Sequence, residues 1–166
     1  NPYDIWRILE RSASIYSNNI AFEYNSHKIT YSEMYNICIH LIQWLQSKLK
    51  KKQCTLFLLL PNCIEHYLLH WVCAGLRWII VNGNTQLTEY ELTYQYKISK
   101  ADIFITNNTL SHKINNHMYI KIPHISRFMN KPNLVWFPKY SSISQPYQMY
   151  FTSGTTGKPK CVLHTF

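Results

Sequence analysis

Three short apolar runs, separated by segments with helical signals, constrain the fold more than any other feature of this chain. The runs lie at residues 55–60, 78–81 and 102–106. The first is apolar from its second residue onward and ends at Pro61, as expected of a strand that is buried on both faces. A repeated strand–helix–strand order favours parallel strands joined by right-handed crossovers. The sequence therefore predicts an α/β fold in which helices flank a parallel-rich sheet.

Two capping boxes mark the starts of helices around these runs. In the first, Thr30 is followed three residues later by Glu33. In the second, Thr88 precedes Glu91 at the same spacing. In each pair the two side chains can satisfy free backbone N–H groups of the first helical turn. We therefore expect helices to begin at both threonines, and we expect Asn62 to cap a further helix that ends near residue 75.

The flanking segments complete the expected organisation. Residues 3–16 have apolar side chains at helical spacing, and residues 20–24 and 27–29 are typical of a hairpin. Residues 107–147 are polar and predict loops with short strands. Residues 148–152 and 161–166 are typical of strands. The segment between these last two strands is expected to be a loop, and function often lies in such loops.

That segment has the composition of an anion-binding loop. Residues 152–160 read Thr-Ser-Gly-Thr-Thr-Gly-Lys-Pro-Lys and contain two of the four glycines in the chain. Glycine lets backbone N–H groups approach an anion closely, hydroxyl groups add donors, and lysines add positive charge. The pattern favours a loop that holds a polyphosphate, and the alternative is a surface turn with solvated lysines.

The segment differs from two common nucleotide-binding motifs. A Walker A loop has four residues between its glycines and a hydroxyl residue after its lysine. Here two residues separate Gly154 from Gly157, and Pro159 follows Lys158. The dinucleotide-binding pattern G-x-G-x-x-G does not occur in the sequence.

Read in order, residues 150–160 resemble the phosphate-binding signature of the AMP-forming (adenylate-forming) acyl-CoA synthetase superfamily. Residues 29–34 (Ile-Thr-Tyr-Ser-Glu-Met) resemble the first core motif of this family. Residues 74–76 (Ala-Gly-Leu), with the apolar run to Val81, resemble the second. Residues 58–62 (Leu-Leu-Leu-Pro-Asn) resemble the strand end between them. The resemblance extends from about residue 20 to residue 166.

Some details are similar to the medium-chain branch of that family. These are residues 83–87 (Gly-Asn-Thr-Gln-Leu), the pair Tyr150-Phe151 and residues 164–166 (His-Thr-Phe). Residues 162–165 also resemble acetyl- and propionyl-CoA synthetases, which are the alternative. Cys161 stands where most of the family has glycine, and its Cβ could crowd a neighbouring backbone.

The resemblance implies a fold and a two-step reaction. Residues 1–166 would be the N-terminal portion of an AMP-binding (adenylation) domain, within the large N-terminal domain of an adenylate-forming enzyme. A carboxylic acid would react with ATP to give an acyl-adenylate and pyrophosphate, and coenzyme A would then displace AMP to give acyl-CoA. Mg²⁺ and preorganised donors would offset the negative charge that develops. The catalytic residues would lie beyond Phe166, so the chain alone would be inactive.

The resemblance also implies roles within the loop. The hydroxyl residues would donate hydrogen bonds to the phosphates, the glycines would let the loop close, and the lysines would add charge. No metal ligand is expected among them. Two alternatives stay open: a non-catalytic relative that only binds nucleotide, and an adenylation module that feeds a carrier protein. The implied nucleotide-binding residues are Thr152, Ser153, Gly154, Thr155, Thr156, Gly157, Lys158, Pro159 and Lys160.

The charge of the chain favours anionic partners. Its 17 Lys and Arg residues outnumber 8 Asp and Glu residues, which gives a formal charge of +9. ATP and coenzyme A are both anionic. The lysine cluster at residues 48–52 closes a predicted helix and would complement its dipole there. Aromatic residues are dispersed without a nucleic-acid motif, so nucleic acid is not an expected partner.

The cysteines and the apolar stretches bear on location. Five cysteines without a C-x-x-C pair favour reduced thiols in an intracellular compartment. The resemblance implies the mitochondrial matrix, with the cytoplasm as the alternative. The longest apolar stretch, residues 67–81, is too short to span a bilayer and is interrupted by His70 and Arg77. No transmembrane segment is therefore expected.

Three histidines are further candidate site residues. His66 and His70 lie four residues apart on one face of a predicted helix, a spacing that zinc could use. The pattern H-E-x-x-H is absent, so an ordinary helix surface is the favoured interpretation. His164 would either line the acyl or nucleotide pocket, by resemblance to the family, or pack in the core as a strand residue.

Overall fold

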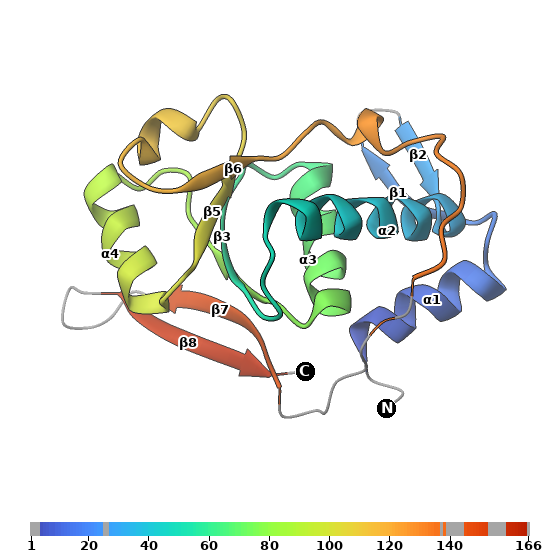
Figure 1. The fold of residues 1–166 in the computed structure, drawn as a ribbon, viewed down its shortest axis with the longest axis horizontal. Coiled ribbons are helices and arrows are strands. Elements are labelled where there is room, and N and C mark those ends of the chain that lie inside the picture. Colours follow the sequence, from blue (N-terminus) through green and yellow to red (C-terminus); the bar gives the residue numbers. More distant parts are fainter. Residues whose placement is uncertain (1–3, 25–26, 137, 139–144, 153–158, 166) are drawn as a thin grey trace.

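A six-stranded sheet forms the centre of the molecule in the computed structural model, which describes residues 4–24, 27–136, 138, 145–152 and 159–165. The strand order is β6-β5-β3-β4-β7-β8 (Figure 1). All neighbours from β6 to β7 pair in parallel, and only β8 runs antiparallel, beside β7. This topology confirms the predicted parallel-rich α/β fold. The strands are β3 (Thr55–Leu59), β4 (Ile79–Asn82), β5 (Ile103–Thr106), β6 (Tyr119–Lys121), β7 (Pro146–Thr152) and β8 (Lys160–Thr165).

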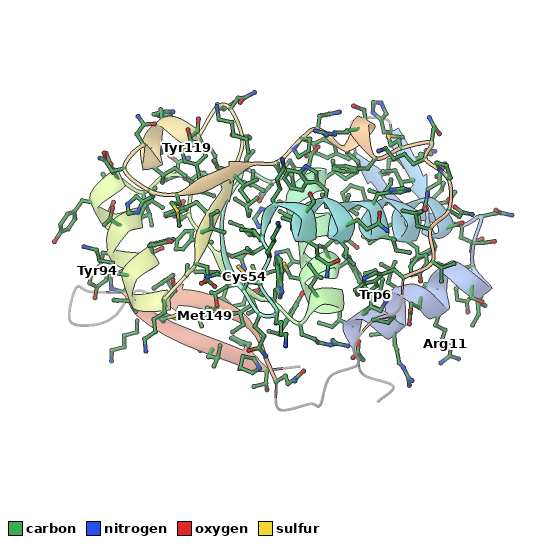
Figure 2. The ribbon with its side chains drawn as sticks, in the orientation of Figure 1. Trp6, Arg11, Cys54, Tyr94, Tyr119 and Met149 are labelled. Carbon is green, nitrogen blue, oxygen red and sulfur yellow. The ribbon has the colours of Figure 1, made fainter. Side chains whose placement is uncertain are left out.

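Helices cover the two faces of the sheet. Leu56, Leu58 and Ile80 belong to a buried cluster with side chains of the first three helices. Phe57 and Val81 point to the other face, where they pack with Leu92 of the fourth helix. Side chains fill the space between these layers (Figure 2). The helices are α1 (Ile5–Ile15), α2 (Tyr31–Lys48), α3 (Ile64–Leu76) and α4 (Glu89–Ser99), with short 3₁₀ turns η1 (Ser111–Ile114) and η2 (Ile125–Arg127).

The N-terminal hairpin and both capping boxes are confirmed. Strands β1 (Ile20–Tyr24) and β2 (His27–Thr30) pair antiparallel, and the turn between them lies outside the described residues. Thr30 caps α2 and Thr88 caps α4, each with the reciprocal glutamate contact. Local side-chain chemistry is therefore sufficient to fix where these two helices begin.

The start of α3 differs from the prediction. Its N-cap is Cys63, which makes no side-chain capping bond, and not Asn62. Cys63 keeps an extended backbone (φ −139°, ψ 168°), so the helical conformation starts at Ile64. The side chain of Asn62 is thus one residue too early to cap the helix. The predicted cap at this position was wrong.

A buried ion pair connects the ends of two helices. The carboxylate of Asp4 caps α1 by accepting hydrogen bonds from the N–H groups of Trp6 and Arg7. The same carboxylate accepts a hydrogen bond from the Arg77 guanidinium at 2.6 Å, and the Asp4 side chain is fully buried. Arg77 ends α3 in the left-handed conformation (φ 61°), and Trp78 still donates to the carbonyl of Cys73. Because the Trp78 N–H is bonded within this helix end, β4 starts at Ile79 and not at residue 78.

Two glycines lie where a side chain would not fit. A Cβ atom at Gly75 would come within 2.7 Å of the Trp6 ring. A Cβ atom at Gly83 would come within 2.4 Å of the Phe57 ring and 2.9 Å of the Leu58 carbonyl. Gly75 lies in the second of the motifs described above, and this packing gives that motif a structural reason.

Candidate functional site

The β7–β8 hairpin holds both ends of the predicted phosphate-binding loop. Thr152, the last residue of β7, pairs with Lys160, the first residue of β8. Their backbones are therefore neighbours at the end of an antiparallel ladder. Both residues are exposed. The predicted residues Ser153, Gly154, Thr155, Thr156, Gly157 and Lys158 lie outside the described residues.

Strand β7 separates packing side chains from exposed ones. Met149 and Phe151 pack against the cluster under α4, and Met149 is labelled in Figure 2. Tyr150 and Thr152 point to the opposite face because side chains alternate along a strand. Paired residues share a face, so Lys160 lies on the same side as Thr152. One face of the hairpin is thus anchored, and the other presents a hydroxyl and an ammonium group that can contact an anion.

The structure places Cys161 and His164 in β8. Cys161 is half-buried opposite Phe151, and burial raises the pKa of its thiol. His164 is exposed and contacts the edge of the Tyr150 ring, with ring centres 5.3 Å apart. Of the two predictions for His164, packing in the core was wrong, because its side chain is exposed. A place in a pocket stays a prediction.

A cavity of about 580 Å³ lies beside Pro159, where the chain enters β8. Its walls include Leu87 and Tyr94, on the segment that leads into and forms α4. Gln95, also on the wall, is 5% exposed, and its side-chain oxygen has no hydrogen-bond partner among the described residues. The cavity therefore offers an aromatic wall and a buried acceptor for an N–H or O–H donor. Sequence reasoning missed Gln95, because only the packing of α4 against the hairpin brings it near Pro159.

The histidine pair of α3 is half-buried beside the end of β4. The rings of His66 and His70 stack with their centres 5.5 Å apart, and His66 Nε2 lies 3.0 Å from the side-chain oxygen of Asn82. Burial, with the neighbouring His66, lowers the pKa of His70 to about 4. The prediction of an ordinary helix surface missed this burial, because the contact to Asn82 spans 16 residues of sequence.

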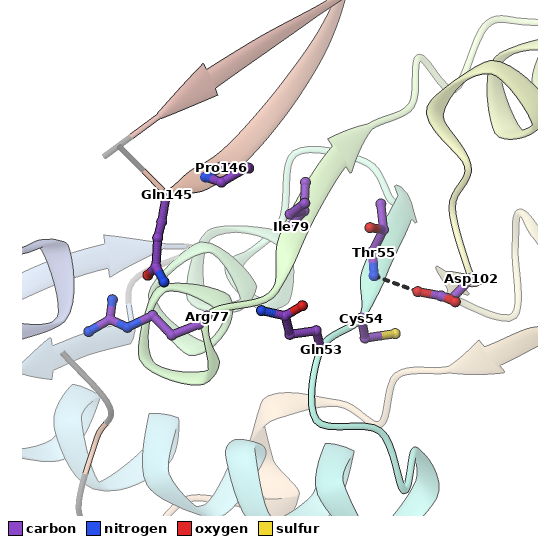
Figure 3. Close-up of a pocket in the computed structure, with 8 residues that line it drawn as sticks. All are labelled: Gln53, Cys54, Thr55, Arg77, Ile79, Asp102, Gln145 and Pro146. Carbon is purple, nitrogen blue, oxygen red and sulfur yellow. Dashed lines mark hydrogen bonds between the residues drawn. The ribbon is translucent and has the colours of Figure 1, made fainter. Parts of the chain in front are cut away.

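A smaller cavity, of about 290 Å³, lies at the other end of the parallel strands, where β3 and β4 begin (Figure 3). Its charged groups already have partners. Asp102 accepts from the backbone N–H of Thr55 at 2.7 Å and pairs with Lys51, while Arg77 pairs with Asp4. The pKa of Asp102 is lowered: its burial opposes that shift, and the hydrogen bonds from Lys51 and Thr55 outweigh the burial. These contacts make the charged residues here part of the scaffold, whereas the buried side-chain oxygen of Gln145, which also lines the cavity, has no hydrogen-bond partner among the described residues.

Three further features concern metal binding, membrane spanning and the state of the cysteines. In the described ranges, no three His, Cys, Asp or Glu side chains lie close enough together to hold a metal ion. No helix in the described part of the chain is both long and apolar enough to span a membrane. All five cysteines have free thiols, and burial raises the pKa of Cys54 to about 12.

Comparison with known proteins relates this geometry to a family. A model of the AMP-binding enzyme family matches residues 9–166. Acyl-coenzyme A synthetase ACSM3, mitochondrial, of Mus musculus is 32% identical over 124 residues, which cover 64% of this chain and 21% of that protein. The 2-succinylbenzoate–CoA ligase of Bacillus subtilis is 25% identical over 158 residues, 95% of this chain and 32% of that ligase. The chain thus spans between a fifth and a third of the length of these curated relatives.

Solved structures share the fold. The N-terminal subdomain of Klebsiella oxytoca NpsA, in complex with 3-hydroxyanthranilyl-AMSN, superposes with a TM-score of 0.82 at 19% identity, covering 96% of this chain and 40% of that one. O-succinylbenzoate coenzyme A synthetase (MenE) of Bacillus subtilis, in complex with ATP and magnesium ion, gives 0.81 at 22% identity, covering 97% and 43%. Since the family model spans nearly the whole sequence and the fold agrees with it, the chain belongs to the AMP-binding enzyme family.

Proposed function

We propose that this chain is the nucleotide-phosphate-binding part of an acid–thiol ligase that activates a carboxylic acid with ATP. The observation that carries the proposal is the hairpin. Thr152 and Lys160 lie at paired, exposed positions on either side of a segment that resembles the phosphate signature of AMP-forming synthetases. The product of the complete protein would be an acyl-CoA, formed through an acyl-adenylate with release of pyrophosphate and AMP.

The chemistry needs positive charge and donors around the phosphates. A carboxylate has to approach a polyanion, and the leaving pyrophosphate gains negative charge in the transition state. The ammonium group of Lys160 and the hydroxyl of Thr152 would contact phosphate oxygens. Ser153, Thr155 and Thr156 would add donors, and Gly154 and Gly157 would let the backbone approach. Each charge-assisted hydrogen bond would contribute about 1.5–3 kcal/mol.

The donor set fits ATP with magnesium. Mg²⁺ keeps several waters and is held mainly through substrate phosphates with one or two carboxylates. A loop that contacts the phosphates without carboxylates of its own is compatible with that arrangement. Mg²⁺ would supply charge neutralisation at the phosphates, while the hairpin of this chain would hold and orient them.

We assign a medium-chain fatty acid as the substrate class. Residues 83–87 and the pair Tyr150-Phe151 resemble the medium-chain branch, and ACSM3 is among the similar proteins. A pocket of intermediate length would favour longer chains until it is full, since each buried methylene contributes about 0.8 kcal/mol. The match to 2-succinylbenzoate–CoA ligase, which covers more of this chain, supports a second candidate, an aromatic acid. The ACSM3 relatives are named mitochondrial, which supports the same compartment for this protein.

The test compares acids with the complete protein. It should be incubated with ATP, Mg²⁺, coenzyme A and one of acetate, butyrate, hexanoate, octanoate, palmitate or 2-succinylbenzoate, and kcat/KM for AMP release should be measured. We expect the maximum at hexanoate or octanoate. A maximum at 2-succinylbenzoate or acetate would overturn the medium-chain assignment, and no AMP release with any acid would overturn the ligase proposal. The 166-residue chain alone should release no AMP, because the catalytic residues are expected beyond Phe166.

A further inference from the structure

A separate cavity of about 360 Å³ lies at the C-terminal ends of α2 and α3, beside the residues that precede β3 and β4. Its walls include Leu49, Leu76 and Trp136, and its rim carries Lys50 and Lys52. The predicted phosphate loop follows the other end of β7, which runs parallel to β4. The cavity and the predicted loop therefore lie at opposite ends of the parallel strands (Figure 1).

The basic residues near this cavity differ in whether they make contacts that stabilise the fold. Lys48 lies in the last turn of α2 and complements the dipole of that helix. Arg77 donates to the carbonyl of Ala74 at the end of α3, and Lys51 pairs with Asp102 at 2.5 Å. Lys50 and Lys52 are exposed and form no ion pair within the part of the chain that the structure describes.

The wall beside these lysines is apolar and aromatic. Trp136 packs one edge against Trp6, with ring centres 5.1 Å apart and planes at 78°, and it stays partly exposed where it lines the cavity. Trp78 and Leu76 form the buried side, with exposed fractions of 1% and 9%. A cavity with an apolar wall and a few charged groups at its mouth is the usual form of a small-molecule site.

We propose that this cavity binds an organic anion whose apolar or aromatic body lies against Trp136 and Leu76 and whose carboxylate or phosphate group contacts Lys50 and Lys52. A fatty acid and a nucleoside monophosphate share this chemistry. Inorganic phosphate lacks the apolar body, so it should bind much more weakly. The site is independent of the proposed function, since it shares no residue with the hairpin.

Amide and indole N–H chemical shifts can test the proposal residue by residue. The ¹⁵N-labelled chain should be titrated separately with octanoate, AMP and inorganic phosphate. We expect octanoate, AMP or both to shift the signals of residues 49–52 and 75–78 and the Trp136 indole, at least about tenfold more tightly than phosphate. The organic anion that binds more tightly identifies the source. Shifts confined to Thr152, Lys160 and their neighbours would overturn this proposal while supporting a nucleotide site on the hairpin, and equal affinity for phosphate would also overturn it.

Charge-matched variants complete the test. Lys50→Gln combined with Lys52→Gln should weaken binding about tenfold, because two ion contacts are lost. Lys121→Gln combined with Lys131→Gln removes the same charge from exposed positions away from the cavity and should leave the affinity unchanged. If the bound anion has an aromatic body, Trp136→Leu should lower the affinity for AMP more than the affinity for octanoate. Equal weakening by the two lysine pairs would show that only the net charge matters and would overturn the site.

Discussion

Strands β3 and β4 and the hairpin β7–β8 belong to one sheet but differ in how much of their surface is covered. Leu56, Leu58 and Ile80 are fully buried between α1–α3 and the sheet. On the open face of the hairpin, Tyr150 and its paired residue Val162 are 42% and 40% exposed. Since buried apolar area dominates stability, the β3–β4 region should contribute most to the stability of the fold, while the hairpin packs through one face and leaves the other exposed. Substitutions should therefore separate the two roles.

The largest effect is expected at the buried Asp4–Arg77 ion pair, which joins the start of α1 to the end of α3. Asp4→Ala would leave the Arg77 guanidinium buried without its carboxylate and would also remove the cap of α1. Breaking a buried pair from one side costs about 3–5 kcal/mol. Urea unfolding of the 166-residue chain should show this loss. A change below about 1 kcal/mol would show that the pair does not hold α1 against α3.

A pair of identical substitutions compares the two regions directly. Leu58→Ala in β3 removes a fully buried side chain and should lower the free energy of unfolding by about 2–5 kcal/mol. Leu163→Ala in β8 changes a half-exposed side chain and should cost less than about 1 kcal/mol. Equal losses in urea unfolding would contradict the division of roles.

The half-buried histidine of α3 predicts how stability depends on pH. Burial and the neighbouring His66 lower the folded pKa of His70 to about 4, below its ordinary value of about 6.5. As the pH falls, the unfolded state therefore binds the proton first. The contribution is fully present above pH 6.5 and declines by about 3 kcal/mol between pH 6.5 and pH 4.

His70→Gln should flatten this decline relative to the wild type. Unfolding free energies of both proteins, measured across the same pH range, give the difference. An imidazole NMR titration of His70 with a midpoint near 6.5 would contradict the burial of this side chain.

How much the sequence could predict depends on the range of the interaction. The capping boxes at Thr30 and Thr88 and the buried strands were predicted correctly because adjacent residues determine them. The ion pair of Asp4 with Arg77 joins residues 73 apart, and no local pattern indicates it. The N-cap of α3 was assigned one residue too early, because side-chain preference does not fix where the backbone becomes helical.

The site was predictable to a different degree. The order of residues 152–160 predicts a phosphate-binding loop, and the fold places Thr152 and Lys160 at paired positions on either side of the segment between them. The nucleotide-binding roles of all residues from Thr152 to Lys160 stay predictions. The exposure of His164 and the position of Gln95 beside Pro159 depend on contacts between segments that are far apart in the sequence. That information is tertiary, so periodicity could not supply it.

The central claim is that the hairpin holds nucleotide phosphate without contributing much to the fold, and ATP–pyrophosphate exchange tests it most directly. The complete protein should be compared with its Lys160→Ala variant, and with Lys28→Ala as a control for loss of one exposed lysine. Losing one charge-assisted contact of about 1.5–3 kcal/mol predicts a carboxylate-dependent exchange rate roughly 10- to 100-fold lower for Lys160→Ala, with an unchanged melting temperature. Lys28→Ala should exchange like the wild type. Full exchange activity in Lys160→Ala, or a loss matched by a fall in melting temperature, would contradict the claim.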